Sequence, residues 1–542
     1  MSTRVAAKSV LFGVATILIL LLGTSIAYAS PLLAGCGLPG DLNNDGRVNI
    51  ADIMLVANCW RSTDPADIAS YDSDGDGDID IVDIMLVAKE WGNSCAVAPW
   101  TIDTSGLDTD PAMRDLAAAA GFRWMRTFIN WRGIEPNAPV NGQHTYNWPD
   151  GLFNVYRNDR RLAPLVVVAA PNPTWAAVSY DPRYCGPIDP AHLDDFGEFV
   201  YQLVARYADV ASYWAFYNEQ DNWTDRTSDH DAGGCWGGHG AEYAQMLAVA
   251  WDAAHSANPD AQVIFGGVAY EPVWNQGVHW DRLFFRDAFR YMRDNPGPGY
   301  VDLILANQYN AYRDDWDGGS STLPANQEII AKFHQAVSDA SFNPNVPGAY
   351  SIARWQSAYG LDKPMGASEV GSQVTSGCSD VPTCEEVQAR HAVHVNVRGL
   401  AAGLKIISWY TLVDKPTDSL KYGLVRSDLT LRPAYTAYQV LTQQLDGYEF
   451  DQQLVVSGKP NIQAYRFDRD GVKKLVLWRD SGEKLKSQST TATETMAVSA
   501  AQLGTWTGQV RVTNKLGNAQ TVSGPSSVNL TFSSDPIYVE AY

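Results

Sequence analysis

The sequence is poor in positive charge and in long hydrophobic runs. Only 40 of its 542 residues are Lys or Arg, against 61 Asp or Glu, which gives a formal net charge of −21. A chain with this charge repels phosphate backbones, so nucleic acid is not an expected partner. After Tyr28 no segment reaches 18 uninterrupted apolar residues, so no further membrane-spanning helix is predicted.

The composition nevertheless supplies ample material for packed cores. Hydrophobic residues make up 45% of the chain and charged residues 19%, which excludes disorder throughout. The length predicts two to four domains. The 18 Trp and 26 Tyr fit both ordinary core packing and sugar-stacking platforms, and their number alone does not separate the two.

The N-terminus reads as a targeting segment. Arg4 and Lys8 precede an apolar run from Val10 to Tyr28, and Ala27-Tyr28-Ala29 offers small residues for cleavage. We therefore predict a secretory signal within residues 1–35 and a secreted or cell-surface protein. The run is also long enough for an uncleaved membrane anchor. Leu33-Ala34-Gly35-Cys36 resembles a bacterial lipoprotein box, so membrane contact is expected only if this segment is retained or lipidated.

Seven cysteines are an odd number, so at least one is unpaired or modified. An exported protein can keep disulfides. Proximity along the chain suggests three pairs, with Cys36–Cys59 an equally open choice for the first: Cys59–Cys95, Cys185–Cys235 and Cys378–Cys384.

A 12-residue acidic loop occurs twice. Residues 41–52 (DLNNDGRVNIAD) and 72–83 (DSDGDGDIDIVD) are offset by 31 residues, and each loop runs into the hexapeptide DIMLVA. Such self-similarity indicates two copies of one supersecondary unit. Gly46 and Gly77 occupy position 6, where a calcium loop turns sharply.

The spacing of oxygen donors in both loops suits calcium, which prefers six to eight hard oxygen ligands. We therefore predict two bound Ca²⁺ ions. The candidate ligands stand at positions 1, 3, 5, 7, 9 and 12, with position 7 acting through its carbonyl: Asp41, Asn43, Asp45, Arg47, Asn49 and Asp52 in the first loop, and Asp72, Asp74, Asp76, Asp78, Asp80 and Asp83 in the second.

Position 12 is Asp rather than the Glu of an EF-hand, and one apolar helix is expected after each loop. In these features residues 36–96 resemble the dockerin module of cellulosome-type enzymes. The resemblance implies two calcium ions and docking onto a cohesin-type scaffold protein.

Residues 97–445 alternate short apolar runs with helical stretches, which predicts an α/β fold with a parallel (β/α)8 TIM barrel. Runs that are apolar throughout suit strands buried on both faces. Eight strands are expected, of which the first is the weakest pattern: 100–105, 122–130, 165–170, 213–219, 263–269, 301–309, 365–371 and 404–412.

Two carboxylates stand at the carboxyl ends of these runs, where TIM barrels carry their chemistry. Glu219 ends the fourth run and Glu369 lies near the end of the seventh. Two carboxyl groups at the same end of the barrel suit glycoside hydrolysis, in which one acts as proton donor and the other as nucleophile.

At Asn218-Glu219 and Glu369 the chain resembles the clan of retaining TIM-barrel glycosidases, with a layout similar to family 39 or family 5. The resemblance covers residues 100–445 and implies Glu219 as acid/base and Glu369 as nucleophile, without a catalytic cofactor. The implied substrate is a plant-type polysaccharide or oligosaccharide. Which glycan is cleaved, and whether at chain ends or internally, stays open.

The same resemblance implies a set of substrate-binding and supporting residues. Arg126 and Tyr309 match residues that contact the nucleophile. Asn307 stands where many members carry His, so its role is an open point. Asn218 is expected to bond the sugar 2-hydroxyl. Trp409 matches the aromatic floor under the cleaved sugar. Trp131, Trp175 and Trp223, in the loops after the second, third and fourth strands, are candidates for further sugar subsites.

From residue 446 to 542 the pattern changes to short alternating strands, which predicts a β-sandwich. The strands are expected at 462–467, 473–478, 508–513, 527–532 and 536–542. No Pro- or Ser-rich linker separates this part from the barrel, so a fixed interface is expected. A structural cap is the favoured role, and carbohydrate binding is the alternative.

Two other classes of function remain beside the secreted retaining glycosidase. The barrel can be a non-catalytic glycan-binding domain, or the chain can be a surface protein assembled through its calcium module. The presence of both carboxylates favours the enzyme.

Overall fold

The computed structural model of the 542-residue chain describes most of the barrel and the C-terminal part and a portion of the N-terminal module. The described residues are Gly40, Leu42, Val48, 50–89, 99–178, 184–222, 235–269, Asp281, 283–297, 299–309, 328–334, 337–345, 350–375, 379–482 and 490–542. The predicted signal segment lies outside them. Among the described helices, none is both long and apolar enough to cross a membrane.

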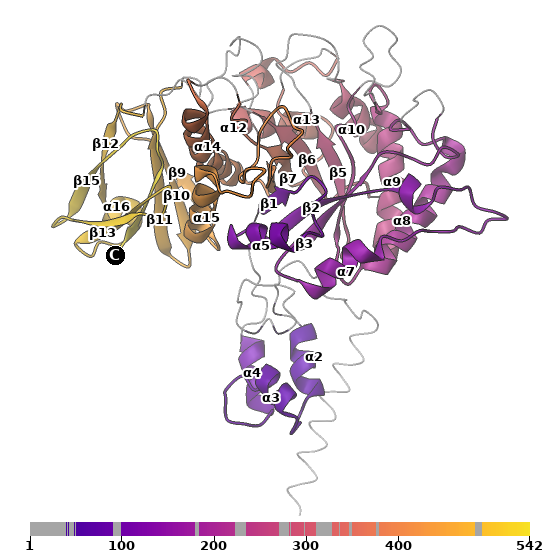
Figure 1. The fold of residues 1–542 in the computed structure, drawn as a ribbon, viewed down its shortest axis with the longest axis horizontal. Helices are drawn as coiled ribbons and strands as arrows, with labels where there is room; N and C mark the ends of the chain where they lie inside the picture. The colour runs from indigo at the N-terminus through magenta and orange to yellow at the C-terminus, as the bar shows by residue number, and fades with distance from the viewer. Residues whose placement is uncertain are drawn as a thin grey trace, which may run out of the picture.

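Eight parallel strands form a closed barrel in which each strand pairs with the next and β1 pairs with β8 (Figure 1). This confirms the predicted TIM barrel, including its weakest strand. The strands are β1 (Trp100–Asp103), β2 (Trp124–Asn130), β3 (Ala163–Ala169), β4 (Tyr213–Asn218), β5 (Gln262–Val268), β6 (Leu303–Gln308), β7 (Met365–Val370) and β8 (Ile407–Tyr410).

Helices follow the strands in sequence and surround the barrel, as the βα alternation requires (Figure 1). They are α5 (Pro111–Ala119), α6 (Trp131–Ile134), α7 (Asp150–Asn158), η2 (Pro190–His192), α8 (Leu193–Tyr207), α9 (Gly240–Ala257), α10 (Phe284–Asp294), α12 (Glu328–Phe333), η3 (Val337–Ser341), α13 (Ile352–Ala358), α14 (Val381–Ala401) and α15 (Pro433–Leu445).

The barrel has two apolar layers because its strands are buried on both faces. A small cluster fills the inside of the barrel, and a much larger one lies between the sheet and the helices. The interior cluster contains Trp124, Leu165, Val167, Ala215, Ile264, Leu303, Leu305 and Ile406. Alternate residues of one strand therefore belong to different layers, and this decides which side chains reach the mouth.

The C-terminal part is a β-sandwich, as predicted. A six-stranded antiparallel sheet of order β14-β13-β16-β11-β10-β9 faces a two-stranded sheet, β12-β15, across an apolar core. The elements are β9 (Glu449–Gln453), β10 (Ile462–Arg469), β11 (Val472–Arg479), β12 (Glu494–Ser499), α16 (Ala500–Leu503), β13 (Gln509–Asn514), β14 (Ala519–Ser523), β15 (Ser527–Phe532) and β16 (Ile537–Ala541).

The sandwich packs against the barrel beside α14 and α15 (Figure 1). Residues spaced four apart on α14 each meet a sandwich residue: Glu386 with Lys515 (3.2 Å), Arg390 with Asp535 (3.6 Å), His394 with Trp478 (ring centroids 4.4 Å apart) and Arg398 with Asp480 (2.5 Å). Arg398 and Asp480 are both buried, so separating the domains would leave uncompensated charges. This contact supports the expectation of a fixed interface.

The described part of the N-terminal module contains three helices, one more than the repeat predicts. Helices α2 (Ile50–Asn58) and α4 (Ile81–Lys89) follow the two acidic loops, and α3 (Pro65–Tyr71) lies between them in sequence. Val56 and Val87 occupy equivalent places in the two hexapeptides, and both are buried in a small core of the module. The duplicated sequence thus folds as a duplicated structure.

The cysteines agree only in part with the expected pairs. Cys185 and Cys235 form a disulfide with a Cα–Cα distance of 4.5 Å, as predicted, and Cys384 is disulfide-bonded. Cys59 is a free thiol beside Asp67, which contradicts both pairings expected for it. Cys36, Cys95 and Cys378 lie outside the described residues.

Candidate active site

The polar side chains of the candidate site lie at the carboxyl ends of the barrel strands. In the strand register, Asp103 on β1 is level with Arg126 on β2 and with Tyr410 on β8. Asn307 on β6 is level with Glu369 on β7. These residues, with Asn218 and Glu219 at the end of β4, surround the mouth of the barrel.

Glu369 is held by two donors that reach it from other strands. Arg126 Nη1 donates to Oε1 at 2.5 Å, and the Tyr309 hydroxyl donates to Oε2 at 2.6 Å. Only 8% of Glu369 is exposed. Because both carboxylate oxygens accept a hydrogen bond, the orientation of the group is fixed.

Glu219 enters the mouth from the opposite side on a backbone of unusual geometry. Its φ is +50°, a left-handed conformation that non-glycine residues seldom adopt, and its N–H donates to the Gly267 carbonyl at 2.8 Å. Burial, the charge of Glu369 and the charge of Asp221 raise the pKa of Glu219 to about 8. The carboxyl group is therefore protonated at neutral pH.

Asn307 contacts Glu219 directly. Its Nδ2 donates to Glu219 Oε1 at 2.9 Å, while its Oδ1 accepts from the Ser368 hydroxyl at 2.7 Å. A Cβ at Gly267 would come within 2.1 Å of Ser368 Oγ, so glycine is needed there to admit this contact. The residue that departs from the family pattern thus supplies a hydrogen bond to the second carboxylate.

Arg126 also forms a hydrogen bond with Asn218 and so fixes the orientation of its side-chain amide. Its Nη2 donates to Asn218 Oδ1 at 2.5 Å. Because a guanidinium only donates, this bond fixes which atom of the Asn218 amide is the oxygen and leaves the nitrogen as a donor. A donor at this position suits a sugar hydroxyl.

The expectation that Trp409 forms the aromatic floor is wrong. Its exposed fraction is 0%, its ring lies between the sheet and the helices near His391 and Tyr438, and its Nε1 donates to the Tyr422 carbonyl. Trp409 belongs to the outer layer because neighbouring strand residues point to opposite faces. The next residue, Tyr410, takes the inner position.

Tyr410 forms an aromatic group with two other tyrosines beside Glu369. Its ring centroid lies 6.4 Å from that of Tyr309 and 5.7 Å from that of Tyr422. Burial and the charges of Asp103 and Glu369 raise the pKa of Tyr410. The half-buried Tyr410 ring is therefore a candidate for contact with a bound sugar.

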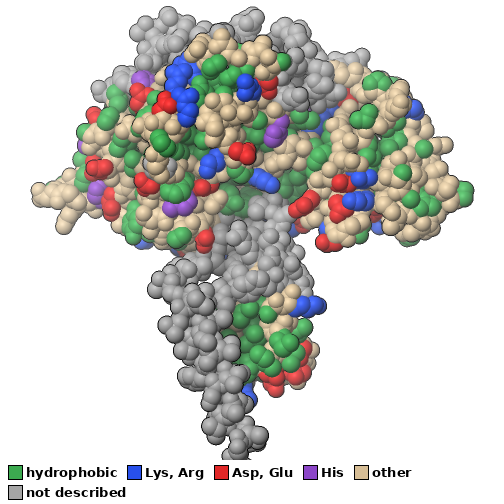
Figure 2. All heavy atoms as spheres, turned by 180° about the vertical axis from the view of Figure 1, so that it is seen from behind, with side chains coloured by type: hydrophobic (Ala, Val, Ile, Leu, Met, Phe, Trp, Pro, Cys, Tyr) green, Lys and Arg blue, Asp and Glu red, His purple; other side chains and the backbone are tan. Residues whose placement is uncertain are grey.

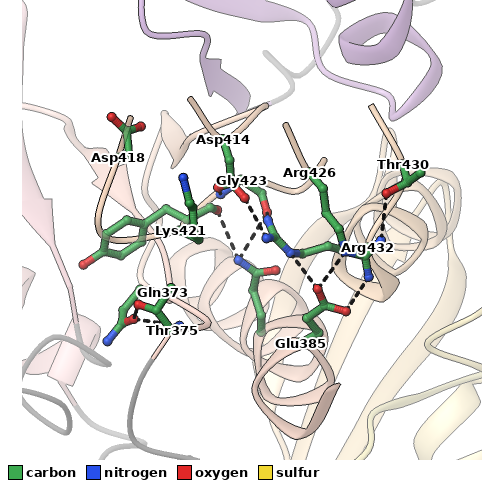
Figure 3. A network of polar contacts seen from close by, with 12 residues as sticks. Gln373, Thr375, Glu385, Asp414, Asp418, Lys421, Gly423, Arg426, Thr430 and Arg432 are labelled. Atoms are coloured by element: carbon green, nitrogen blue, oxygen red, sulfur yellow. Dashed lines mark hydrogen bonds and ion pairs between the residues drawn. The ribbon is translucent and has the colours of Figure 1, made fainter. Parts of the chain in front are cut away.

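The segment that follows β8 is fastened to α14 by a buried charge network (Figure 3). Glu385 accepts bonds from Arg426 (2.9 and 2.5 Å) and from Arg432 (3.0 Å). Arg432 also pairs with Asp414 at 2.6 Å and donates to the Gly423 carbonyl at 2.5 Å. These bonds fix the chain on either side of Tyr422 and so hold its ring at the mouth.

Two further residues near the mouth were not predicted from sequence. Asp103 contacts Arg126 and is buried. Phe128 lies two residues beyond Arg126 on the same face of β2, is 37% exposed, and stacks with the Arg126 guanidinium 4.8 Å from its ring centroid. Alternation along β2 from Arg126 would have identified Phe128, because residues i and i+2 share a face.

The candidate subsite tryptophans differ in their surroundings. Trp175 is half-buried and packs against Trp131 and His192, at centroid distances of 5.3 and 5.2 Å. Trp131 is buried, and its Nε1 donates to Glu135, so it belongs to the core. Trp223 lies outside the described residues.

The second acidic loop of the N-terminal module gathers its carboxylates. Oxygen atoms of Asp72, Asp74 and Asp76 all lie within 4.8 Å of one another. Asp83 is buried at the start of α4 and accepts bonds from the N–H groups of Ser73 (2.6 Å) and Asp80 (2.8 Å). A cluster of this kind fits a hard cation with oxygen ligands, such as calcium.

In the first loop only part of the candidate set can be placed. Asp52 is buried and accepts a bond from the Leu42 N–H at 2.9 Å, which repeats the bond from Ser73 to Asp83. The remaining candidates lie outside the described residues: Asp41, Asn43, Asp45, Arg47 and Asn49.

The loop and helix pattern agrees with a comparison against protein families. Residues 39–90 match the family model of the dockerin type I domain. This segment is a dockerin type I domain. Dockerins of this type bind calcium, which agrees with the gathered carboxylates of the second loop. The curated proteins contain no match to the chain.

The fold of the barrel and sandwich recurs in solved glycoside hydrolases. A family 39 glycoside hydrolase from Bacteroides cellulosilyticus has a TM-score of 0.56 at 17% identity, with 82% of this chain and 81% of that chain covered. A β-xylosidase from Caulobacter crescentus has a TM-score of 0.51 at 16% identity (82% and 96% covered). A family 30 endoxylanase from Clostridium papyrosolvens has a TM-score of 0.50 at 12% identity (82% and 95% covered).

Because Trp409 and Tyr410 lie in different layers, we expect the loss of each side chain to have a different effect. Trp409→Ala should lower the free energy of unfolding by about 3–5 kcal/mol, because it empties a core position. Tyr410→Ala should change stability little but weaken the turnover of glycosides. Thermal unfolding and kcat/KM measured on both variants check this. The result is contradicted if Tyr410→Ala unfolds as easily as Trp409→Ala.

Proposed function

We propose that the protein is a secreted or cell-surface retaining glycoside hydrolase that cleaves O-glycosidic bonds of plant-type polysaccharides or oligosaccharides. Glu219 is the acid/base and Glu369 the nucleophile. The observation that carries this proposal is the pair of carboxyl groups at one barrel mouth, coupled electrostatically and held in different environments. Paired groups with opposite protonation are what glycoside hydrolysis requires.

The environment of each group supports its role. Glu369 is oriented by Arg126 and Tyr309, which hold both oxygens of its carboxyl group in place for attack. Glu219 carries the proton that the leaving oxygen needs. Attack by Glu369 forms a glycosyl ester and neutralises its charge, so the pKa of Glu219 falls and Glu219 becomes the base that activates water. The two groups are close enough for the charge of Glu369 to raise the pKa of Glu219, which supports their acting at one site.

The dockerin domain supplies the proposed attachment. Two Ca²⁺ ions would be held by the two loops, and a cohesin-type scaffold protein is the proposed partner. Hydrophobic side chains of α2 and α4 are exposed on this domain, and acidic side chains gather at its end (Figure 2). The exposed apolar residues are Met54, Ile81, Val82, Met85 and Leu86. Calcium supplies no catalytic step in this proposal.

The proposed division of the chain follows from these roles. Residues 1–35 are the targeting segment, 36–96 the dockerin module, 97–445 the catalytic barrel and 446–542 the β-sandwich. The sandwich buries part of one sheet face against α14. That contact supports a structural role for the sandwich.

Removal of either carboxyl group should affect catalysis in a distinct way. Glu369→Gln should abolish turnover because no ester can form. Glu219→Ala should slow cleavage of poor leaving groups by about 10²–10⁴-fold. Azide should restore the second step of Glu219→Ala on aryl glycosides and give a glycosyl azide of retained configuration. Kinetics and product analysis by NMR over xylan, mannan, glucan and uronic-acid substrates measure this.

Glu198→Gln, an exposed glutamate on α8, is the matched control for the loss of a carboxylate and should keep full activity. Normal turnover by both mouth variants would contradict the assignment. If the wild type gives a product of inverted configuration, the retaining mechanism is contradicted, but the proposal of a glycoside hydrolase stands.

The pKa of Glu219 predicts the alkaline limb of the pH profile. With a pKa of about 8, Glu219 loses its proton as the pH rises, so kcat/KM should fall tenfold per pH unit above pH 8. In enzyme trapped by a 2-fluoro glycoside, the Glu369 charge is gone and the pKa of Glu219 should be lower. NMR titration of labelled glutamate in free and trapped enzyme measures both values. Equal values would contradict the proposed coupling.

Calcium removal should unfold the dockerin domain and leave the barrel active. Without the ion the clustered carboxylates repel one another. Chelation should reduce the helical signal in circular dichroism and abolish cohesin binding while glycoside turnover persists. Calorimetry should find two ions per chain, and one ion in Asp74→Ala. Asp64→Asn, which changes an aspartate outside both loops, should still bind two.

A further inference from the structure

Arg126 has a second buried acidic partner besides Glu369. Asp103 Oδ2 lies 3.4 Å from Arg126 Nη1, the nitrogen that also donates to Glu369. Both side chains of this second pair are almost completely buried. One guanidinium nitrogen is thus shared between carboxylates of β1 and β7.

Asp103 is itself held firmly in place. Its Oδ1 accepts from the Ser105 N–H at 2.6 Å and lies 3.3 Å from the Ser105 hydroxyl. Its backbone carbonyl accepts from the Thr411 hydroxyl (2.7 Å) and from the Leu412 N–H (2.9 Å). These bonds join β1 to the end of β8, so Asp103 is a rigid support for the guanidinium that it contacts.

The group that supports Arg126 has to carry a negative charge. Arg126 donates to Glu369 with one nitrogen and to Asn218 with the other. An unopposed guanidinium would weaken Glu369 as a nucleophile, because it stabilises the free carboxylate more than the ester. A second carboxylate at the same guanidinium nitrogen offsets part of that stabilisation and holds the guanidinium in one position.

We propose that Asp103 is a positioning residue that acts through Arg126, holding the guanidinium so that it presents Glu369 for attack and Asn218 to the sugar. This inference rests on the proposed function and adds a third carboxylate to its site. Asp103 itself touches no reacting atom in this scheme.

The groups that face Asp103 come from several elements. Arg126 on β2, Glu369 on β7 and Tyr410 on β8 are the ionisable neighbours, and Asp108 lies further along its own segment. Burial raises the pKa of Asp103 to about 6, and the Arg126 charge opposes this rise. Asp103 is therefore ionised at neutral pH and loses its charge as the pH falls below about 6.

The test is the pH profile of kcat/KM for Asp103→Asn beside the wild type. The wild type should show an acid limb near pH 6 that reflects the protonation of Asp103. In Asp103→Asn the kcat should fall by up to about 100-fold through misplacement of Arg126. The limb near pH 6 should also move to lower pH, because the amide does not titrate. Asp103→Glu should restore the limb and part of the kcat.

Asp108→Asn is the matched control, since Asp108 is equally buried but bonds Thr104 (2.8 Å) rather than Arg126. It should keep the wild-type kcat and an acid limb near pH 6 that moves only slightly, because the charge of Asp108 contributes least to the raised pKa of Asp103. Thermal unfolding of every variant shows which of them fold. If Asp103→Asn folds and keeps both kcat and the limb, the inference is overturned. If it fails to fold, the profile of Asp103→Glu decides: a wild-type kcat with the acid limb displaced from pH 6 overturns the inference. A wild type that cleaves no glycoside refutes the proposed function instead.

Discussion

The buried guanidinium of Arg126 is the interaction on which the rest of the candidate site depends. It contacts Asp103 on β1, Asn218 on β4 and Glu369 on β7, and so joins residues from three parts of the barrel. A buried cation is tolerated only where acidic and polar groups surround it. The strands therefore have to close into a ring for Arg126 to reach these three partners, and the closed ring in turn brings the proposed catalytic groups together.

Helix α14 contacts segments near the mouth through one face and the β-sandwich through another. Glu385 and Gln388 hold the segment after β8, where Gln388 donates to the Tyr422 carbonyl, and Gln388 also donates to the Ser372 carbonyl after β7. The face that contains Arg390 and Arg398 holds the β-sandwich. The sandwich is thus a neighbour of the helix that positions the mouth, which gives a physical reason for its fixed place beside the barrel.

The sequence predicts the strands with clear apolar runs and misses three strands of the sandwich, β9, β12 and β14, although β12 buries Met496 and Val498. All eight barrel strands were predictable from apolar runs, whereas β9 (EFDQQ) and β14 (AQTVS) are mostly exposed polar edges of the sandwich and carry no such signal. Residue type alone favours Trp409 as the aromatic residue of the mouth, whereas the alternation of side chains along β8 directs Trp409 outward and Tyr410 inward. Asp103 was missed because β1 is four residues long and its pattern is weak. Contacts such as that between Arg126 and Asp103 depend on register across strands, which a single sequence does not contain.

The distribution of hydrogen-bond donors explains why the two glutamates would take different roles. Glu369 receives a charged guanidinium and a phenol hydroxyl, and both stabilise a carboxylate. Glu219 receives the neutral amide of Asn307 and faces the negative charge of Glu369. When two nearby carboxyl groups compete for one proton, it resides on the group whose charge is stabilised less. The proton is therefore expected on Glu219, and the proposed assignment of acid and nucleophile rests on what surrounds each carboxyl group rather than on its residue type.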